Sequence, residues 1–263
     1  MIQAKNLWHI YEGRKEALKG INFEMGQEIV ALVGPNGSGK TTLAKHLNGL
    51  LKPTRGRVTV DGLDTRESTV AELSRKVGYV FQNPENMFFE ETVYREVSFG
   101  PRNLGLDETE VDERVRWALK AVNLEGYEER TPYSLSGGEE QRLAIACILA
   151  MRPRYIVLDE PATGLDAKST KSVVEVIRKL HSEGHGILLI THDMELVLEL
   201  ASRVVLLFGG EKVFDGPIEE FFKLNLKEHA LVKPELLRIS ESLGIGFVRR
   251  PHELVKALEG DAG

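Results

Sequence analysis

The chain has 263 residues, 42% of them hydrophobic, with a formal net charge of −6 and an isoelectric point near 5.8. That charge argues against a protein that binds nucleic acid mainly by electrostatics, because such proteins usually present a basic surface. The single cysteine, Cys147, excludes a disulfide framework, and its place in an apolar helical run is typical of a core residue in a reducing cytoplasm. The apolar runs are strand-length, short of the roughly 18 residues of a membrane span, and we expect no secretory signal peptide. Any membrane crossing is therefore expected on another chain.

Apolar runs and turn residues predict strands and helices in a regular order along the chain. Strands are predicted at residues 28–33, 56–62, 76–82, 155–160, 186–193 and 203–210. Helices are predicted over residues 40–51, within residues 91–151, and over residues 168–184. Strands that alternate with helices indicate a parallel α/β core, here interrupted by a helical insertion. After about Leu224, two amphipathic pieces that each begin with proline predict a small C-terminal extension.

The sequence GPNGSGKT, residues 34–41, lies between a predicted buried strand and a predicted helix. Its glycines let successive backbone N–H groups face inward around phosphate oxygens, as the pattern G-x-x-x-x-G-K-[ST] requires. Lys40 is placed to reach the β- and γ-phosphates, and the hydroxyl of Thr41 is placed to bind Mg²⁺. The motif and its context predict a site for a nucleoside triphosphate.

Polar side chains follow three other predicted strands. Asp159 and Glu160 come directly after the apolar run YIVL, at the strand end where open α/β sheets bind ligands. A carboxylate at Asp159 would hold Mg²⁺ through water, and Glu160 would accept a proton from an attacking water. His192 and Gln82 end two further strands. From the residues alone, a structural or turn role fits either of them as well as a functional one.

A second candidate anion site lies in the segment YSLSGGEEQR, residues 133–142. Ser136 and Glu139 have the spacing of a capping box at the start of an apolar helix. Such a helix start presents free N–H groups and a positive dipole end, and Gly137 and Gly138 would let a ligand approach closely. The segment therefore predicts an anion site, and leaves open which anion it binds.

Taken together, these motifs resemble those of the ATP-binding cassette (ABC) ATPases over about residues 1–225. The resemblance implies an α/β P-loop NTPase core with a parallel sheet, an antiparallel N-terminal β part and a helical insertion over about residues 91–151. It also implies that residues 226–263 form a C-terminal helical extension that contacts a dimer partner. The matching positions, in chain order, are Tyr11, Gly34, Pro35, Asn36, Gly37, Ser38, Gly39, Lys40, Thr41, Thr42, Gln82, Ser136, Gly137, Gly138, Asp159, Glu160, Asp166 and His192.

The resemblance also implies which anion the second helix start binds. In this family two ATPase domains pair head to tail. Ser136, Gly137 and Gly138 of one subunit then contact the γ-phosphate held by Lys40 of the other, and Asp166 crosses the dimer interface. Hydrolysis would therefore require a partner subunit.

Three further roles follow from the same resemblance. Tyr11 would stack on adenine, and His192 would contact the γ-phosphate and the attacking water. Gln82 would reach Mg²⁺ and report to a membrane subunit. ATP and Mg²⁺ are the expected ligands, and the absence of an N-K-x-D motif favours ATP over GTP.

Chain length and motif spacing indicate to which branch of the family the sequence is similar. Lys40 and Ser136 are 96 positions apart, which leaves no room for the long coiled coils of DNA-repair and chromosome-structure members. Translation-type members carry two cassettes per chain, and this chain has one. Residues 80–106 are similar to the energy-coupling factor group, which includes cobalt and nickel importer ATPases. Met87, where many members have glutamine, and Ala167, where proline is common, depart from that group.

The resemblance thus implies an ATP-hydrolysing importer subunit, peripheral at the cytoplasmic face of the cell membrane, that serves uptake of a vitamin or a transition-metal ion. Its partners would be a second ATPase subunit, identical or different, a transmembrane scaffold and a substrate-binding membrane protein. After Gln82, an apolar groove with Phe88 and Phe89 exposed is expected to receive a scaffold helix. The alternative is a non-transport ATPase of this superfamily that acts as a nucleotide-driven switch on a soluble partner.

Overall fold

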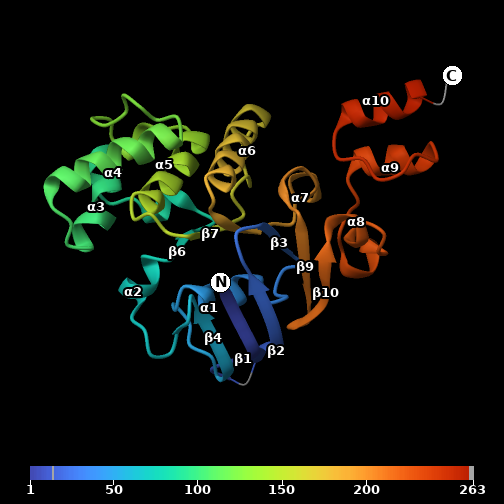
Figure 1. The fold of residues 1–263 in the computed structure, drawn as a ribbon, viewed down its shortest axis with the longest axis horizontal. Coiled ribbons are helices and arrows are strands. Elements are labelled where there is room, and N and C mark those ends of the chain that lie inside the picture. Colours follow the sequence, from blue (N-terminus) through green and yellow to red (C-terminus); the bar gives the residue numbers. More distant parts are fainter. Residues whose placement is uncertain (14, 261–263) are drawn as a thin grey trace.

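Two β-sheets form the centre of the structure, a computed structural model that describes residues 1–13 and 15–260 (Figure 1). The larger sheet has six strands in the order β10-β9-β3-β8-β7-β6, and the smaller has four in the order β2-β1-β4-β5. The strands are β1 Ile2–Tyr11, β2 Lys15–Met25, β3 Ile29–Val33, β4 Arg55–Val60, β5 Leu63–Asp64, β6 Val77–Val80, β7 Tyr155–Asp159, β8 Gly186–Ile190, β9 Arg203–Phe208 and β10 Glu211–Pro217.

Helices connect and flank the strands (Figure 1). The α-helices are α1 Lys40–Leu47, α2 Val70–Ser74, α3 Val93–Asn103, α4 Glu108–Ala121, α5 Gly137–Leu149, α6 Ala167–Ser182, α7 Met194–Leu200, α8 Ile218–Phe221, α9 Glu235–Ser242 and α10 Pro251–Gly260. Short 3-10 helices are η1 Pro84–Met87, η2 Pro132–Ser134 and η3 Leu226–His229.

The larger sheet is parallel except at one edge. Strands β9, β3, β8, β7 and β6 run parallel, and β10 pairs antiparallel with β9. Every residue of β3, β6, β7 and β8 is buried. Burial of continuous apolar runs is what a parallel sheet covered on both faces requires. The predicted parallel α/β core is confirmed.

The smaller sheet is antiparallel, with β1 paired to both β2 and β4. Its apolar face packs on α1 and on the larger sheet, where Leu7 and Leu18 of the smaller sheet share a buried cluster with Leu43 and Leu47 of α1. The antiparallel N-terminal β part implied by the family resemblance is therefore present. Its position beside α1 brings the ends of β1 and β2 next to the phosphate loop.

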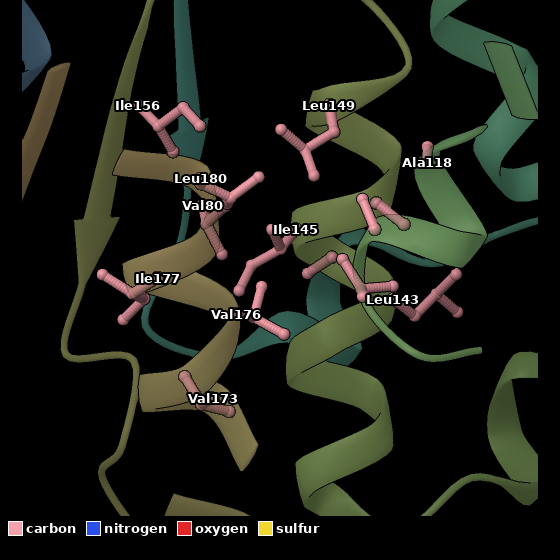
Figure 2. Packing of buried hydrophobic residues seen from close by; sticks show 14 of the residues in the cluster. Val80, Ala118, Leu143, Ile145, Leu149, Ile156, Val173, Val176, Ile177 and Leu180 are labelled. Carbon is pink, nitrogen blue, oxygen red and sulfur yellow. The ribbon is translucent and has the colours of Figure 1, made fainter. Parts of the chain in front are cut away.

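Helices α3, α4 and α5 pack on one another as the predicted helical insertion, and α4 and α5 also contact α6. Figure 2 shows side chains of α5, among them Ile145 and Leu149, directed toward those of α6, among them Val176 and Leu180. All four belong to one buried cluster, so truncating any of them to alanine would cost about 1–5 kcal/mol of stability. Cys147 packs against the same cluster, where burial raises the pKa of its thiol.

The C-terminal extension shares a core with the strand-bearing part of the chain. Leu231, Leu237 and Val248 are buried in the same cluster as residues of α7 and α8. Arg249 donates hydrogen bonds from Nε to the carbonyl of Leu198 at 3.0 Å and from Nη2 to that of Ala201 at 2.7 Å. Figure 1 shows α9 and α10, in red, at the opposite end of the larger sheet from α3 and α4, in green.

The predicted strands at 76–82, 186–193 and 203–210 end two or three residues earlier than expected, and the first predicted helix ends earlier still. The helix expected over residues 40–51 ends at Leu47, because Asn48 has a non-helical conformation and Gly49 is left-handed with a φ of +77°. The left-handed backbone favours glycine here, and a Cβ on Gly49 would also lie 2.4 Å from the tip of the Leu73 side chain of α2. The chain therefore leaves the helix four residues earlier than the sequence pattern indicated.

The parallel strands bring the predicted site residues to one edge. The phosphate loop follows β3, Asp159 and Glu160 lie at the end of β7, and His192 follows β8. Because β3, β8 and β7 are adjacent and parallel, their carboxyl ends meet at the same edge of the sheet. This edge is where open α/β sheets bind ligands.

Candidate nucleotide site

The phosphate loop connects β3 to α1 and leaves the start of that helix without a side-chain cap. The residue before the helix, Gly39, is left-handed with a φ of +106°. A Cβ at this position would lie 2.6 Å from the carbonyl oxygen of Ala17, so a larger residue does not fit. The uncapped N–H groups and the positive dipole end of α1 therefore face the loop, as an anion site requires.

Lys40 reaches back into the phosphate loop. Its Nζ donates hydrogen bonds to the carbonyl oxygens of Gly34 at 2.7 Å and Pro35 at 3.1 Å. Burial lowers the pKa of Lys40, while the nearby carboxylates of Glu160 and Asp159 oppose that shift. A phosphate oxygen is charged and therefore forms a stronger hydrogen bond with an ammonium group than a carbonyl oxygen does. The ammonium of Lys40 is thus placed to replace its hydrogen bonds to the loop carbonyls with one to a bound phosphate.

Asp159, at the end of β7, is held by two hydroxyl groups. Its Oδ2 accepts hydrogen bonds from Tyr79 Oη at 2.7 Å and from Thr41 Oγ1 at 3.3 Å. Burial raises the pKa of Asp159, and the hydrogen bonds from both hydroxyls oppose this rise. Burial, together with the charge of Asp159, also raises the pKa of Tyr79, which keeps its hydroxyl protonated and able to donate.

Glu160 has a left-handed backbone, with a φ of +52°. For a residue other than glycine this conformation costs of order 1–3 kcal/mol and is typical of functional sites. Oε1 of Glu160 lies 2.8 Å from Nδ1 of His192, and Oε2 accepts hydrogen bonds from the hydroxyls of Thr163 and Thr191. Because an ionised carboxylate only accepts, this geometry puts the imidazole proton on Nδ1 and leaves Nε2 available.

Tyr11, the last residue of β1, lies beside helix α1. Its Oη lies 3.1 Å from Oγ1 of Thr42, and its ring meets that of His9 edge to face with centroids 4.5 Å apart. The Tyr11 side chain remains partly exposed. An exposed aromatic face of this kind can stack on a planar ligand.

A cavity of about 620 Å³ collects these residues. Its size falls within the roughly 300–1,000 Å³ of small-molecule sites. The predicted residues that line it are Tyr11, Gly34, Pro35, Asn36, Gly37, Gly39, Lys40, Thr41, Thr42, Gln82, Asp159, Glu160 and His192. Ser38, also predicted, is buried and does not line the cavity.

Four other predicted residues, Ser136, Gly137, Gly138 and Asp166, do not line the cavity. The carboxylate of Glu139 accepts hydrogen bonds from the N–H of Ser136 at 2.9 Å and from its hydroxyl at 2.8 Å. The predicted helix start at Ser136 is therefore present. Asp166 caps α6 by accepting from the N–H of Ser169 at 2.7 Å, and this hydrogen bond lowers the pKa of Asp166.

The lack of a side chain at Gly138 has a packing reason. A Cβ at Gly138 would lie 2.5 Å from the Cβ of Ser169, so glycine lets α5 and α6 approach closely. At Gly137 the nearest atom to such a Cβ is 3.5 Å away, on the side chain of Leu165. Packing of α5 on α6 therefore accounts for the glycine at position 138 but not for the one at position 137.

The expectation that Phe88 and Phe89 are both exposed is wrong for Phe88. Phe88 is only 6% exposed and belongs to the core of the helical insertion, whereas Phe89 is 59% exposed. The carboxylate of Glu96 accepts hydrogen bonds from the N–H groups of Phe89 and Glu90, and the hydroxyl of Tyr133 donates to the carbonyl of Phe88. These contacts fix the backbone so that one ring enters the core and the next lies on the surface.

The geometry of the cavity agrees with comparisons to known proteins. A family model described as ABC transporter matches residues 18–163. The chain belongs to the ABC transporter family. This ABC ATPase has the ATP-hydrolysing domain of that family and the fold of its solved cassettes.

Full-length relatives support the assignment. A provisionally named ABC transporter ATP-binding protein of Pyrococcus abyssi is 59% identical, covering 98% of this chain and 99% of the relative. The energy-coupling factor transporter ATP-binding protein EcfA of Methanothermobacter thermautotrophicus is 42% identical, covering 100% of this chain and 89% of the relative. The solved structure of cbiO1 from Clostridium perfringens, part of the ABC transporter complex cbiONQ, matches with a TM-score of 0.80 and 33% identity, covering 93% of this chain and 98% of that chain.

Sequence reasoning missed several residues of the ABC ATPase site. Lys15 and Ala17 of β2 line the cavity, as do residues 230–232 of the C-terminal extension. The register that pairs Tyr11 with Lys15 could have placed β2 there, but no local pattern marks residues 230–232. Tyr79 was also missed, although it carries the single polar group among the side chains of the run VGYV.

The described helices of this ABC ATPase include none with both the length and the apolar character needed to cross a bilayer.

Proposed function

We propose that this ABC ATPase is the ATP-hydrolysing subunit of an energy-coupling factor type importer, in which membrane subunits carry a vitamin or a transition-metal ion. The main support for this proposal is that one cavity is lined by a phosphate loop, by Asp159 and by the hydrogen-bonded pair Glu160 and His192. The 42% identity to an energy-coupling factor ATP-binding protein, over the whole chain, supports the transport role. In this proposal the chain lies on the cytoplasmic face of the membrane.

Mg²⁺ fits the residues at one wall of the cavity. The hydroxyl of Thr41 and the carboxylate of Asp159 lie 3.3 Å apart, and Gln82 lines the same cavity. All three supply oxygen atoms, which are the ligands Mg²⁺ prefers. We propose that these residues hold the ion, which when bound would neutralise charge on the β- and γ-phosphates.

Glu160 is the general base in this proposal. A water attacks the γ-phosphorus, the bond from that phosphorus to the bridging oxygen of ADP breaks, and the proton of the water passes to the Glu160 carboxylate. His192, which donates to Oε1 of Glu160, orients this carboxylate and presents Nε2 to the cavity side. Lys40 stabilises the phosphate charge with its ammonium group.

A second subunit completes the site. Ser136 and Gly137 lie outside the cavity of their own chain, at a helix start whose free N–H groups suit an anion. We propose that the partner's equivalent helix start covers the γ-phosphate here, and that Asp166 lies at the interface. Each chain then holds half of two sites.

The docking surface for the membrane scaffold is proposed at Phe89 and Phe99. Both rings are exposed, at 59% and 43%, and meet edge to face with centroids 4.7 Å apart. An apolar helix of the scaffold would cover this pair by the helix-in-groove mode. The segment that carries Phe89 begins at Gln82, so its movement would link the nucleotide site to the membrane.

The test separates a transporter subunit from a nucleotide switch. The wild-type chain and the Phe89→Ser variant each carry an affinity tag. Each is used to capture partners from a detergent extract of source membranes and from the aqueous extract. We expect proteins with several membrane spans to be captured from the detergent extract by the wild type and depleted with the variant. Capture of partners from the aqueous extract alone, equal for both forms, would contradict the transport role and support the switch.

A further inference from the structure

The strongest contact to Asp159 comes from a residue outside every motif used above. Oη of Tyr79 donates a hydrogen bond to Oδ2 of Asp159 at 2.7 Å, shorter than the 3.3 Å from the hydroxyl of Thr41 to the same oxygen. Tyr79 is 5% exposed and Asp159 is 6% exposed. The interaction is therefore largely shielded from competing water.

The sheet register explains why a tyrosine can make this contact. Tyr79 of β6 is the register partner of Val157 of β7. Asp159 lies two residues further along β7, on the same face, about 6.6 Å onward along the strand. A long side chain with a donor at its tip bridges that distance. Tyr79 is further held by Phe81, whose ring centroid is 4.7 Å from its own.

The hydroxyls of Tyr79 and Thr41 both donate to the same oxygen of the Asp159 carboxylate. Both hydroxyls bind Oδ2, and within the described residues no hydrogen bond is made to Oδ1. Because hydrogen bonds hold one of its oxygens, the carboxylate cannot rotate freely about the Cβ–Cγ bond. Its remaining oxygen then points in one direction instead of two.

We propose that Tyr79 is a positioning residue that fixes the Asp159 carboxylate so that Oδ1 is presented to the divalent cation of the nucleotide site. The inference rests on the proposed nucleotide chemistry and adds a residue to it. Groups that hold a metal ligand by hydrogen bonding typically contribute about 10–100-fold to metal affinity. Removing only the hydroxyl of Tyr79 should therefore weaken the metal and leave the nucleotide-binding loop unchanged.

The chain offers a matched control. Tyr155 also lies in the sheet, at the first residue of β7, and is 1% exposed. Its hydroxyl donates to Oδ1 of Asp61 at 2.9 Å. This tyrosine–aspartate pair is at the amino end of the strand, opposite the edge that carries the cavity. Tyr79→Phe and Tyr155→Phe each remove one hydroxyl from a tyrosine–aspartate pair.

The experiment titrates Mn²⁺, as a spectroscopic substitute for Mg²⁺, into chains saturated with a non-hydrolysable ATP analogue and follows free Mn²⁺ by electron paramagnetic resonance. Thermal unfolding without nucleotide checks the fold, and affinity for the analogue in EDTA checks the phosphate loop. We expect Tyr79→Phe to lose about 10–100-fold in Mn²⁺ affinity. In EDTA its nucleotide affinity should match the wild type, and Tyr155→Phe should match the wild type in both measurements.

Three results would distinguish failure of the positioning role from failure of the proposed function. If the wild type binds the analogue and Mn²⁺ but Tyr79→Phe, with its fold intact, binds Mn²⁺ equally well, the positioning role is wrong and the nucleotide site stands. An equal loss in Tyr155→Phe would also overturn it, because the effect would then be one of general stability. If the wild type itself shows no metal-dependent nucleotide binding, the proposed function fails.

Discussion

Nδ1 of His192 lies 2.8 Å from Oε1 of Glu160, so a hydrogen bond joins two residues that follow the neighbouring strands β8 and β7. The two residues are 32 positions apart in the chain. The bond ties the proposed base to the residue expected at the γ-phosphate. Changes at either position should therefore affect the chemical step more than nucleotide binding.

Glu160→Gln should retain ATP binding and lose most hydrolysis. Glutamine keeps an oxygen that can accept from His192, but it cannot take a proton from water, and removing a general base typically costs about 10²–10⁴-fold in rate. Calorimetric ATP affinity and steady-state phosphate release measure the two effects. Glu175→Gln, at an exposed position of α6, serves as the control. Near-normal turnover in Glu160→Gln would refute the assignment of the base.

Lys40→Ala should lose tight ATP binding. The ammonium is the main cationic partner that this chain offers a triphosphate in the loop, and it already lies within hydrogen-bond distance of the loop carbonyls. Isothermal titration with ATP measures the loss. Lys45→Ala, on the same helix but outside the cavity, should bind ATP like the wild type. Unchanged affinity in Lys40→Ala would contradict the phosphate-loop assignment.

Shared sites predict that two inactive variants restore activity when mixed. Ser136→Arg damages the helix start that a chain offers its partner, and Glu160→Gln damages the base of its own site. A mixed dimer has one composite site with both features intact, so random pairing should restore about a quarter of wild-type activity. ATP hydrolysis is measured for each variant alone and after subunit exchange. Activity no greater than the average of the two variants would indicate self-contained sites.

If the native partner is a different ATPase, the same test requires the two substitutions on opposite chains. The expected pattern is then activity when one composite site stays intact and none when both are damaged.

Phe89→Ser should weaken scaffold binding and transport while leaving ATP hydrolysis by the isolated dimer largely unchanged. The substitution removes an exposed ring, whereas serine at buried Phe88 would cost about 3–5 kcal/mol of stability and confuse the result. Val70→Ser, at another exposed apolar position, is the control. The measurement is the affinity of each form for the scaffold in detergent-solubilised complexes. Equal affinity for the wild type and Phe89→Ser would place the docking site elsewhere.

The buried imidazole of His46 should make stability depend on pH. Burial lowers the pKa of His46 from 6.5 to about 4, although its hydrogen bond to the carbonyl of Thr42 opposes the shift. The unfolded chain therefore binds a proton below about pH 6.5 that the folded chain takes up only near pH 4. Stability is fully present above that window and falls as pH drops through it, by about 1.4 kcal/mol per pH unit.

Urea unfolding at about pH 7.5 and about pH 5 tests this expectation. The wild type should lose roughly 2 kcal/mol more over this interval than His46→Gln, which has no imidazole to titrate. His252→Gln, at an exposed position, should behave like the wild type. An equal loss for the wild type and His46→Gln would show that His46 does not govern the acid response.

Local sequence was enough to predict the phosphate loop. The eight residues 34–41 are consecutive, and their function depends on backbone conformations and side chains that the same residues supply. The strand-end positions of Asp159, Glu160 and His192 were also readable, because a continuous apolar run indicates a buried parallel strand. The order of these motifs along the chain is enough to indicate the family, because it does not depend on any tertiary contact.

Contacts between distant segments determined the rest. Phe88 and Phe89 have the same side chain at adjacent positions, yet one is buried and the other is exposed. The backbone that orients them is held by hydrogen bonds from the N–H of Phe89 to Glu96 and from the hydroxyl of Tyr133 to the carbonyl of Phe88. At Gly138 the neighbouring helix, through Ser169, requires glycine whatever a ligand requires.

The bond between Tyr79 and Asp159 joins residues 80 positions apart. A periodic apolar pattern says which face of a strand is buried, but the identity of the neighbouring strand and its register depend on how the whole sheet assembles. Local sequence therefore specified which side chains each segment carries to the site. The tertiary structure determined which side chains meet there, because hydrogen bonds and packing act between surfaces that the chain order does not place together.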